Sequence, residues 1–329
     1  MSYRFGRVSG VTSQIAPDKP EVRRELGRWL PGYLLLAGIW GTSFLFIKVG
    51  VRELHPLWLT FGRVLAGAAT LLVVLAVTRG RLPRDRVVWL HLIVVATVGV
   101  SLPFTLFGFG EQRVSSVLAG IWNAATPLVA LPLAVLAFRT EKMTFWRAAG
   151  IAIGFAGVLV VLGVWRGVGG AQLTGQLMCF GAAMCYAVAI PYQKRFVAGR
   201  TGSGVSLAAA QLLIALVQLA VCAPLLAGAP PAPVSLSLPV ILSVLALGAL
   251  GTGLAFVLNL RVIRIAGAST SASVTYLMPV VATIVGVVVL REHLVWNQPV
   301  GAMIVLAGVA VSQRLAGRRR SVSTVPGGP

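Results

Sequence analysis

One arginine lies inside an apolar segment of the sequence. Arg63 occurs in LTFGRVLAGA, residues 59–68, among residues that otherwise suit a membrane-spanning helix. On insertion scales an arginine at the centre of such a helix costs about 2.5–3.5 kcal/mol. The side chain either extends to the lipid headgroups, or faces the protein interior and binds a carboxylate or phosphate of a solute. The sequence alone leaves both alternatives open.

A set of small and polar residues recurs at helical spacing between residues 116 and 127. Ser116, Gly120, Asn123 and Pro127 share one helix face, because they follow one another at intervals of four, three and four positions. Small residues leave space there, Asn123 supplies donors and an acceptor, and Pro127 frees a backbone carbonyl one turn earlier. The pattern predicts one wall of a substrate cavity, although the same residue types also join helices by hydrogen bonds in membranes.

A related pattern returns near residue 275. Thr275 and Pro279 stand 152 positions after Asn123 and Pro127, with further polar residues beside them. Two tryptophans are candidates for the cavity wall, although packing or interface anchoring explains them as well. The candidate substrate-binding residues are therefore Trp40, Arg63, Ser116, Trp122, Asn123, Pro127, Ser273, Thr275, Tyr276 and Pro279.

Chemistry beyond solute binding has little support in the sequence. A proton relay requires a buried carboxylate or histidine, and Glu111 is the best candidate, although a rim ion pair with Arg113 explains it equally well. Lys48, near a helix end, is expected to extend to the headgroups. The sequence has no converging catalytic set, no metal-ligand spacing and no phosphate-binding glycine loop. We therefore expect no catalytic residues, no metal and no cofactor.

These residues require a membrane-embedded frame. Of the 329 residues, 57% are hydrophobic and only 11% charged, whereas soluble domains carry about 25% charged residues. Spanning helices need about 17–25 apolar residues. Ten such runs are predicted, at residues 30–49, 56–77, 88–108, 114–136, 145–163, 172–193, 206–227, 238–260, 268–290 and 297–313.

The net charge of +20 comes mostly from short basic segments between these runs. Segments 78–86, 138–147, 193–200 and 261–264, together with the two termini, hold 22 of the 28 Lys and Arg residues. Cytoplasmic loops carry such an excess, so both termini are predicted to be cytoplasmic. Nucleic-acid-binding proteins instead gather basic residues on one folded face, so nucleic acid is not expected as a partner. The other side keeps Lys48, Arg52, Arg113, Arg166 and Arg291.

The two halves of the chain align with each other. The offset that sets Pro127 on Pro279 also pairs Phe104 with Phe256 and Gly99 with Gly251. Five helices per half, an odd number, place the second half in the membrane upside down, which is the inverted-repeat plan of many secondary transporters. The second half then lacks one residue relative to the first, and three further pairs follow: Glu141 with Glu292, Gly150 with Gly301, and Gly157 with Gly308. We interpret these six residues as structural markers of the repeat.

Three features follow one another in the sequence: GIWGTSFLFIKVG, LTFGRVLAGA and the Pro–Glu–Gly pattern, which recurs in the second half. Together they resemble the EamA family of the drug/metabolite transporter superfamily over about residues 30–313. The resemblance implies a ten-helix transporter of the cytoplasmic membrane that exports amino acids, metabolites or drugs. The second half has Gln211 where the first has Arg63, so the binding site is expected to be asymmetric.

We therefore predict an all-α integral membrane protein with ten transmembrane helices in two inverted five-helix repeats, residues 30–163 and 172–313. Residues 1–29 and 314–329 are predicted as cytoplasmic tails. The expected function is secondary transport, with the bilayer and a small-molecule substrate as partners and a homodimer left open. An integral-membrane enzyme acting on lipid and a non-transporting scaffold are the weaker alternatives.

Overall fold

The computed structural model describes residues 19–139, 141–163, 170–200 and 202–318, and those residues are helical with short connections and no strand. The prediction of an all-α protein is confirmed. The predicted tails lie largely outside the described residues, as does Arg166. The elements are α1 (Lys19–Gly50), α2 (Pro56–Val77), α3 (Arg86–Ala96), η1 (Thr97–Ser101), α4 (Leu102–Glu111), α5 (Ser116–Ala124), α6 (Thr126–Leu136), α7 (Phe145–Leu162), α8 (Gly170–Phe196), α9 (Gly204–Ala227), η3 (Pro233–Ser235), α10 (Leu238–Leu245), η4 (Ala246–Leu254), α11 (Ala255–Ala266), α12 (Ala268–Ala272), α13 (Val274–Leu290) and α14 (Asn297–Arg318).

Within the described ranges, nine helical segments are long and apolar enough to cross a membrane. They correspond to the first nine predicted spans. The tenth, α14, contributes a shorter apolar stretch, Asn297–Ser312. The chain is therefore a multi-pass membrane protein.

Four of these spans are interrupted. The third and eighth each contain a π-helical turn, η1 and η4. The fourth span breaks between α5 and α6, where Pro127 occupies the first turn of α6. The ninth breaks at Ser273, between α12 and α13. Each interruption recurs at the same span of the other half, so the irregularities follow the sequence repeat.

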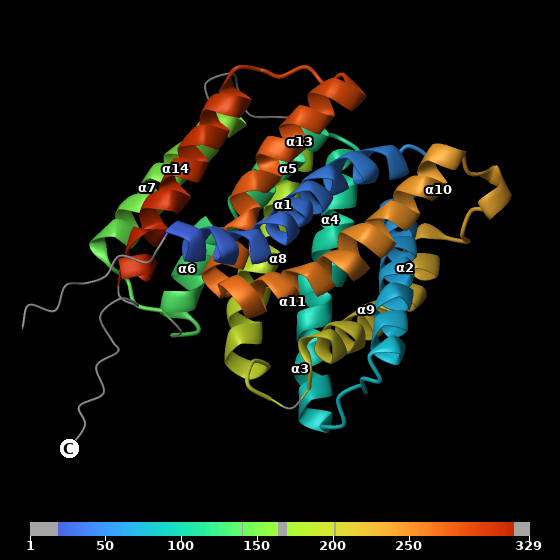
Figure 1. Cartoon of the computed structure of the whole chain (residues 1–329). Coiled ribbons are helices and arrows are strands. Elements are labelled where there is room, and N and C mark those ends of the chain that lie inside the picture. Colours follow the sequence, from blue (N-terminus) through green and yellow to red (C-terminus); the bar gives the residue numbers. More distant parts are fainter. Residues whose placement is uncertain (1–18, 140, 164–169, 201, 319–329) are drawn as a thin grey trace, which may run out of the picture.

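The packing exchanges elements between the two halves. Helix α1 contacts α10, α11 and α13 of the second half, and α8, its counterpart, contacts α4, α5 and α6 of the first. Two further pairs of counterparts pack on each other, α2 on α9 and α7 on α14, and α7 and α14 lie side by side at one edge of the bundle (Figure 1). This reciprocal pattern is what two inverted repeats around one approximate axis require.

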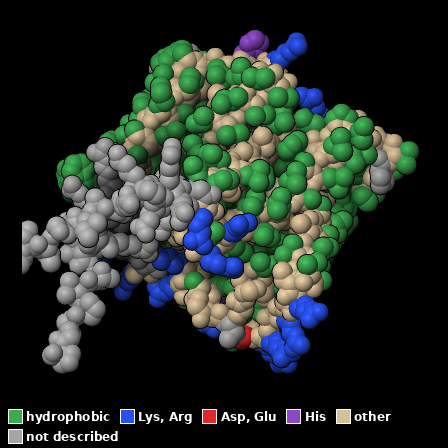
Figure 2. Space-filling view, viewed as in Figure 1, with side chains coloured by type: hydrophobic (Ala, Val, Ile, Leu, Met, Phe, Trp, Pro, Cys, Tyr) green, Lys and Arg blue, Asp and Glu red, His purple; other side chains and the backbone are tan. Residues whose placement is uncertain are grey.

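The order of the spans along the chain defines two ends of the bundle. We call the end at which α2, α6, α8 and α11 finish the basic end, and the end at which α1, α4, α9 and α13 finish the far end. Exposed basic side chains such as Arg81, Arg139 and Arg264 belong to the basic end. Between the ends, large hydrophobic side chains are exposed over much of the visible face (Figure 2). Such a surface suits contact with lipid.

Helix α7 packs against α14 through glycines. A Cβ on Gly150 would lie 2.5 Å from the carbonyl oxygen of Gly308, and one on Gly308 would lie 2.4 Å from the backbone nitrogen of Gly154. Gly157 and Gly301 approach each other in the same way. The backbones of the two helices are thus in direct contact, which only glycine permits at these positions.

Candidate functional site

A cavity of about 220 Å³ lies between the two halves, near the middle of the bundle. Aromatic side chains from both halves line much of it, among them Trp40, Phe104, Phe107, Tyr186 and Phe256. Ligand pockets commonly measure about 300–1,000 Å³, so this one suits a small solute.

Arg63 faces this cavity and not the headgroups. Its side chain is only 8% exposed, and its Nε donates a hydrogen bond to Thr252 Oγ1 at 3.0 Å. The guanidinium carbon lies 3.6 Å from the centre of the Phe104 ring, a cation–π contact. Among the described residues, no acidic side chain forms an ion pair with Arg63. Of the two alternatives raised by the sequence, the structure has the Arg63 side chain facing the protein interior, and its binding of a carboxylate or phosphate stays a prediction.

Four of the ten candidate substrate-binding residues line the cavity: Trp40, Arg63, Asn123 and Thr275. Asn123 is buried, with its Nδ2 3.8 Å from Met278 Sδ, another lining residue. Asn123 and Thr275, which the sequence repeat aligns, both line the cavity, and their contact with substrate stays a prediction.

The structure places the other six candidates away from the cavity lining. Ser116 binds Glu292, and Ser273 Oγ lies 2.9 Å from the hydroxyl of Tyr33. Trp122 is buried with its ring edge-on to Phe180. The remaining three, Pro127, Tyr276 and Pro279, shape or pack the broken helices around the cavity.

Sequence reasoning missed the two π-helical turns. Gly99 in η1 and Gly251 in η4 both line the cavity, on the third and eighth spans. Turns of this kind often mark functional sites, because they disturb the regular backbone hydrogen bonding. The alignment of Gly99 with Gly251 was the available signal, but glycine alone does not specify a π turn.

Glu292 joins the halves at the far end. Its carboxylate accepts hydrogen bonds from the backbone N–H and the hydroxyl of Ser116, at 2.8 and 2.9 Å, and from the N–H of Val117 at 3.2 Å. It therefore caps the first turn of α5, where free N–H groups and the helix dipole favour an anion.

The far end holds a second acidic contact, in the loops. Glu53 accepts two hydrogen bonds from Ser237, one from the backbone N–H at 2.8 Å and one from the hydroxyl at 2.6 Å. These bonds lower the pKa of the exposed Glu53 carboxyl, because they favour its charged form.

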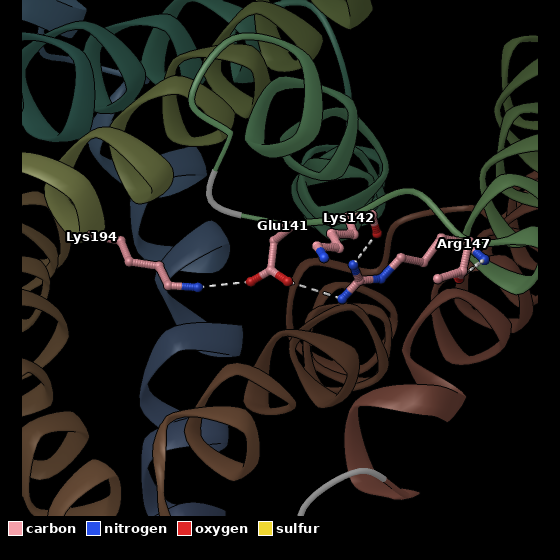
Figure 3. Close-up of polar contacts among 5 residues, drawn as sticks. Glu141, Lys142, Arg147 and Lys194 are labelled. Atoms are coloured by element: carbon pink, nitrogen blue, oxygen red, sulfur yellow. Dashed lines mark hydrogen bonds and ion pairs between the residues drawn. The ribbon is translucent and has the colours of Figure 1, made fainter.

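Glu141, the repeat counterpart of Glu292, has different partners at the basic end. Its carboxylate lies between Lys194 Nζ at 2.7 Å and Arg147 Nη2 at 3.0 Å (Figure 3). Partial burial raises the pKa of the Glu141 carboxyl, but the bonds with Lys194 and Arg147 outweigh it, so the net pKa lies below the usual value of 4.5. Lys142 follows Glu141 in the sequence, but its contact in this cluster is through the backbone: its carbonyl oxygen accepts a hydrogen bond from Arg147 (Figure 3).

Comparisons with known proteins agree with this architecture. The sequence profile of the EamA-like transporter family matches residues 28–163 and 173–313. A probable terminal-alkyne amino-acid exporter of Streptantibioticus cattleyicolor is 30% identical over 87% of this chain and 93% of its own. A probable amino-acid metabolite efflux pump of Salmonella typhimurium is 25% identical over 85% and 92%, respectively. The uncharacterized transporter YoaV of Bacillus subtilis is 23% identical over 88% and 98%. A crystal structure with 22% identity superposes with a TM-score of 0.62 over 89% of this chain and 98% of that one, which supports the fold alone.

Proposed function

Because the chain belongs to the EamA-like transporter family, we propose that it exports small carboxylate-bearing solutes across the cytoplasmic membrane, with Arg63 as the group that binds the carboxylate. The transporting unit comprises both repeats, residues 30–163 and 172–313, with the cavity between them. Asn123 and Thr275 supply neutral hydrogen-bonding groups on the cavity wall.

The buried guanidinium of Arg63 carries this proposal. An uncompensated positive charge beside a cavity attracts an anion, and a guanidinium can bind both oxygens of a carboxylate at once. Thr252 engages only Nε, so a carboxylate in the cavity can approach the terminal nitrogens. Hydrogen bonds to charged groups are each worth about 1.5–3 kcal/mol, which is roughly a tenfold to hundredfold effect on affinity.

Two of the relatives support a carboxylate-bearing substrate by their names. One is named as an exporter of terminal-alkyne amino acids and the other as an amino-acid metabolite efflux pump. Amino acids carry a carboxylate, which is the chemistry that Arg63 suits.

The direction of transport follows from two features that point the same way. The excess of Lys and Arg at the basic end indicates that this end is cytoplasmic. The cavity residues nearest the far end, Ile47 and Phe107, are each 3% exposed, so packed side chains cover the cavity toward that end. A cavity that is closed toward the far end is arranged to load a solute from inside the cell.

Counterflow in proteoliposomes tests the proposal. The probes are radiolabelled L-threonine, L-leucine and L-phenylalanine, with phenethylamine as the analogue of phenylalanine that lacks the carboxylate. We expect the wild-type protein to exchange at least one amino acid and to discriminate against phenethylamine. Equal transport of phenylalanine and phenethylamine would contradict the role of the carboxylate.

The residue assignment is tested with two arginine variants. Arg63→Gln should reduce amino-acid counterflow at least tenfold, whereas Arg113→Gln, whose guanidinium is exposed and bonds to the oxygen of Phe109, should leave it unchanged. Thr252→Val, which removes the acceptor of Arg63 Nε, should raise KM with less effect on the maximal rate. If Arg63→Gln is folded by size-exclusion chromatography and transports normally, Arg63 is not the carboxylate site.

A further inference from the structure

Glu111 is the most deeply buried acidic side chain among the described residues. It is the last residue of α4, its side chain is 0% exposed, and neither carboxylate oxygen has a hydrogen-bond partner. An ionised carboxylate in such a place has lost its hydration without compensation, which is severely unfavourable. The geometry therefore suits the neutral acid. The rim ion pair with Arg113 is absent, because Arg113 Nη1 bonds to the oxygen of Phe109.

The nearest cation does not neutralise Glu111 in this arrangement. Lys48 on α1 donates from Nζ to the backbone oxygens of Glu111 and Val114, at 2.6 and 2.8 Å. The prediction that Lys48 extends to the headgroups was wrong, because these two carbonyls, one at the last residue of α4 and one in the turn after it, bind its ammonium group. Lys48 is thus close to the carboxyl group without bonding to it.

Other titratable groups face Glu111 from the elements packed around it. These are Arg63 on α2, Cys179 on α8 and Glu292 beyond the end of α13, in addition to Lys48 on α1. The neighbouring segments η1 and α5 contain no titratable residue. Glu111 consequently lies between two cations and one carboxylate, so a change in its charge alters the forces on all three.

Glu111 also lies just beyond the sealed end of the cavity. Phe107, one helical turn earlier on α4, and Ile47, adjacent to Lys48 on α1, both line the cavity. One turn of helix is about 5.4 Å. Glu111 thus lies between the substrate cavity and the far end. A group that exchanges protons with both sides of the membrane has to occupy such a position.

The segment around Glu111 is held from both halves of the protein. Lys48 of the first half binds the carbonyls at 111 and 114, and Glu292 of the second half caps α5 at Ser116. These contacts from both halves hold the turn between α4 and α5 in place and so keep the far end closed.

We propose that Glu111 is the proton-carrying group that couples this export to the proton gradient, with Lys48 as its switch partner. In the arrangement described, Glu111 is the neutral acid and Lys48 fastens the α4–α5 turn. Loss of the proton to the cytoplasmic side leaves a carboxylate that attracts the Lys48 ammonium away from the two carbonyls, which frees the turn and opens the far end to release the solute. A proton from the far side then restores the O–H bond and lets the turn close, so that one proton enters for each solute molecule that leaves.

This proposal rests on the proposed export function, and the experiment separates the two. The same proteoliposomes are assayed twice with labelled threonine, leucine and phenylalanine, first by counterflow without a pH gradient and then by accumulation against a concentration gradient driven by an imposed pH gradient. Counterflow requires the far end to open and close but no net proton movement, whereas accumulation requires coupling. We expect wild type to perform both. Glu111→Gln is a permanent analogue of the neutral acid, so Lys48 should stay on the two carbonyls, the far end should stay closed, and at least nine-tenths of both activities should be lost.

Glu53→Gln is the matched control, because Glu53 is an exposed acid at the same end. It should retain both activities. If wild type shows no counterflow with any probe, the export proposal fails. If wild type exchanges but does not respond to the pH gradient, or if Glu111→Gln accumulates normally, the coupling proposal is overturned.

A measurement on the wild-type protein covers the case in which Glu111→Gln does not fold. Dicyclohexylcarbodiimide reacts with protonated carboxyl groups in apolar surroundings, and mass spectrometry identifies the modified peptide. We expect labelling at Glu111 and not at Glu53, with parallel loss of gradient-driven accumulation. Absence of label at Glu111 under conditions that inactivate accumulation would contradict the assignment.

Discussion

Glu292 and Ser116 are 176 residues apart in the sequence, yet the N–H and the hydroxyl of Ser116 both donate to the Glu292 carboxylate, at 2.8 and 2.9 Å. The counterpart of Glu292 in the first half, Glu141, forms ion pairs with Lys194 and Arg147 instead. One repeated glutamate thus joins the halves through a helix cap at one end and through salt bridges at the other. The two ends should respond differently to mutation and to pH.

Replacing Glu292 by Gln should loosen the far end. The substitution removes the charge that the first turn of α5 favours and weakens three hydrogen bonds, a loss of about 1–3 kcal/mol. In a background without native cysteines, a cysteine at Val114, which is 4% exposed, should react with a maleimide several-fold faster in Glu292→Gln than in the parent. Glu53→Gln serves as the control. Unchanged reactivity at position 114 would show that the cap does not fasten this end.

Replacing Glu141 by Gln should lower stability in a pH-dependent way. The folded pKa of Glu141 is lowered relative to the usual 4.5, so its ion pairs contribute stability that is fully present above the unfolded value and is lost as the pH falls through the folded value. Partly exposed pairs contribute about 0.2–1 kcal/mol each, so the effect should be small. The difference in melting temperature between wild type and Glu141→Gln should be greatest near neutral pH and vanish at acid pH, below the lowered pKa of the folded protein. A difference that persists there would assign the effect to packing.

The number and order of spans could be predicted from the sequence, because membrane burial imposes long apolar runs and a strong bias in loop charge. The presence of Asn123 and Thr275 in the cavity wall could likewise be predicted, since helical spacing fixes which residues share a face. The partner of Ser116 was not, because Glu292 reaches it from a distant loop that local periodicity does not encode. Lys48 was misjudged for the same reason: backbone carbonyls of another helix bind its ammonium group before it can reach the headgroups.

The glycine contacts between α7 and α14 give a prediction with an internal control. A Cβ on Gly308 would lie 2.4 Å from the nitrogen of Gly154 and 2.6 Å from the oxygen of Gly150, so Gly308→Ala must force the helices apart. We expect a loss of about 1–3 kcal/mol or more in stability. A Cβ on Gly38 of α1 would meet nothing within 4 Å, and Gly38→Ala should be neutral or stabilising by about 0.5–1 kcal/mol. Thermal melts of both variants in detergent test this, and equal effects would contradict it.

The proposed orientation predicts which loops face the cytoplasm. Arg84, exposed at the basic end, and Arg113, exposed at the far end, are replaced singly by cysteine after removal of Cys179, Cys185 and Cys222. Because basic loops are retained on the cytoplasmic side, a membrane-impermeant maleimide should label position 113 in intact cells and position 84 only after permeabilisation. The opposite labelling would invert the protein in the membrane. The cavity, sealed toward the far end, would then load from outside, and the same geometry of Arg63 would serve uptake in place of export.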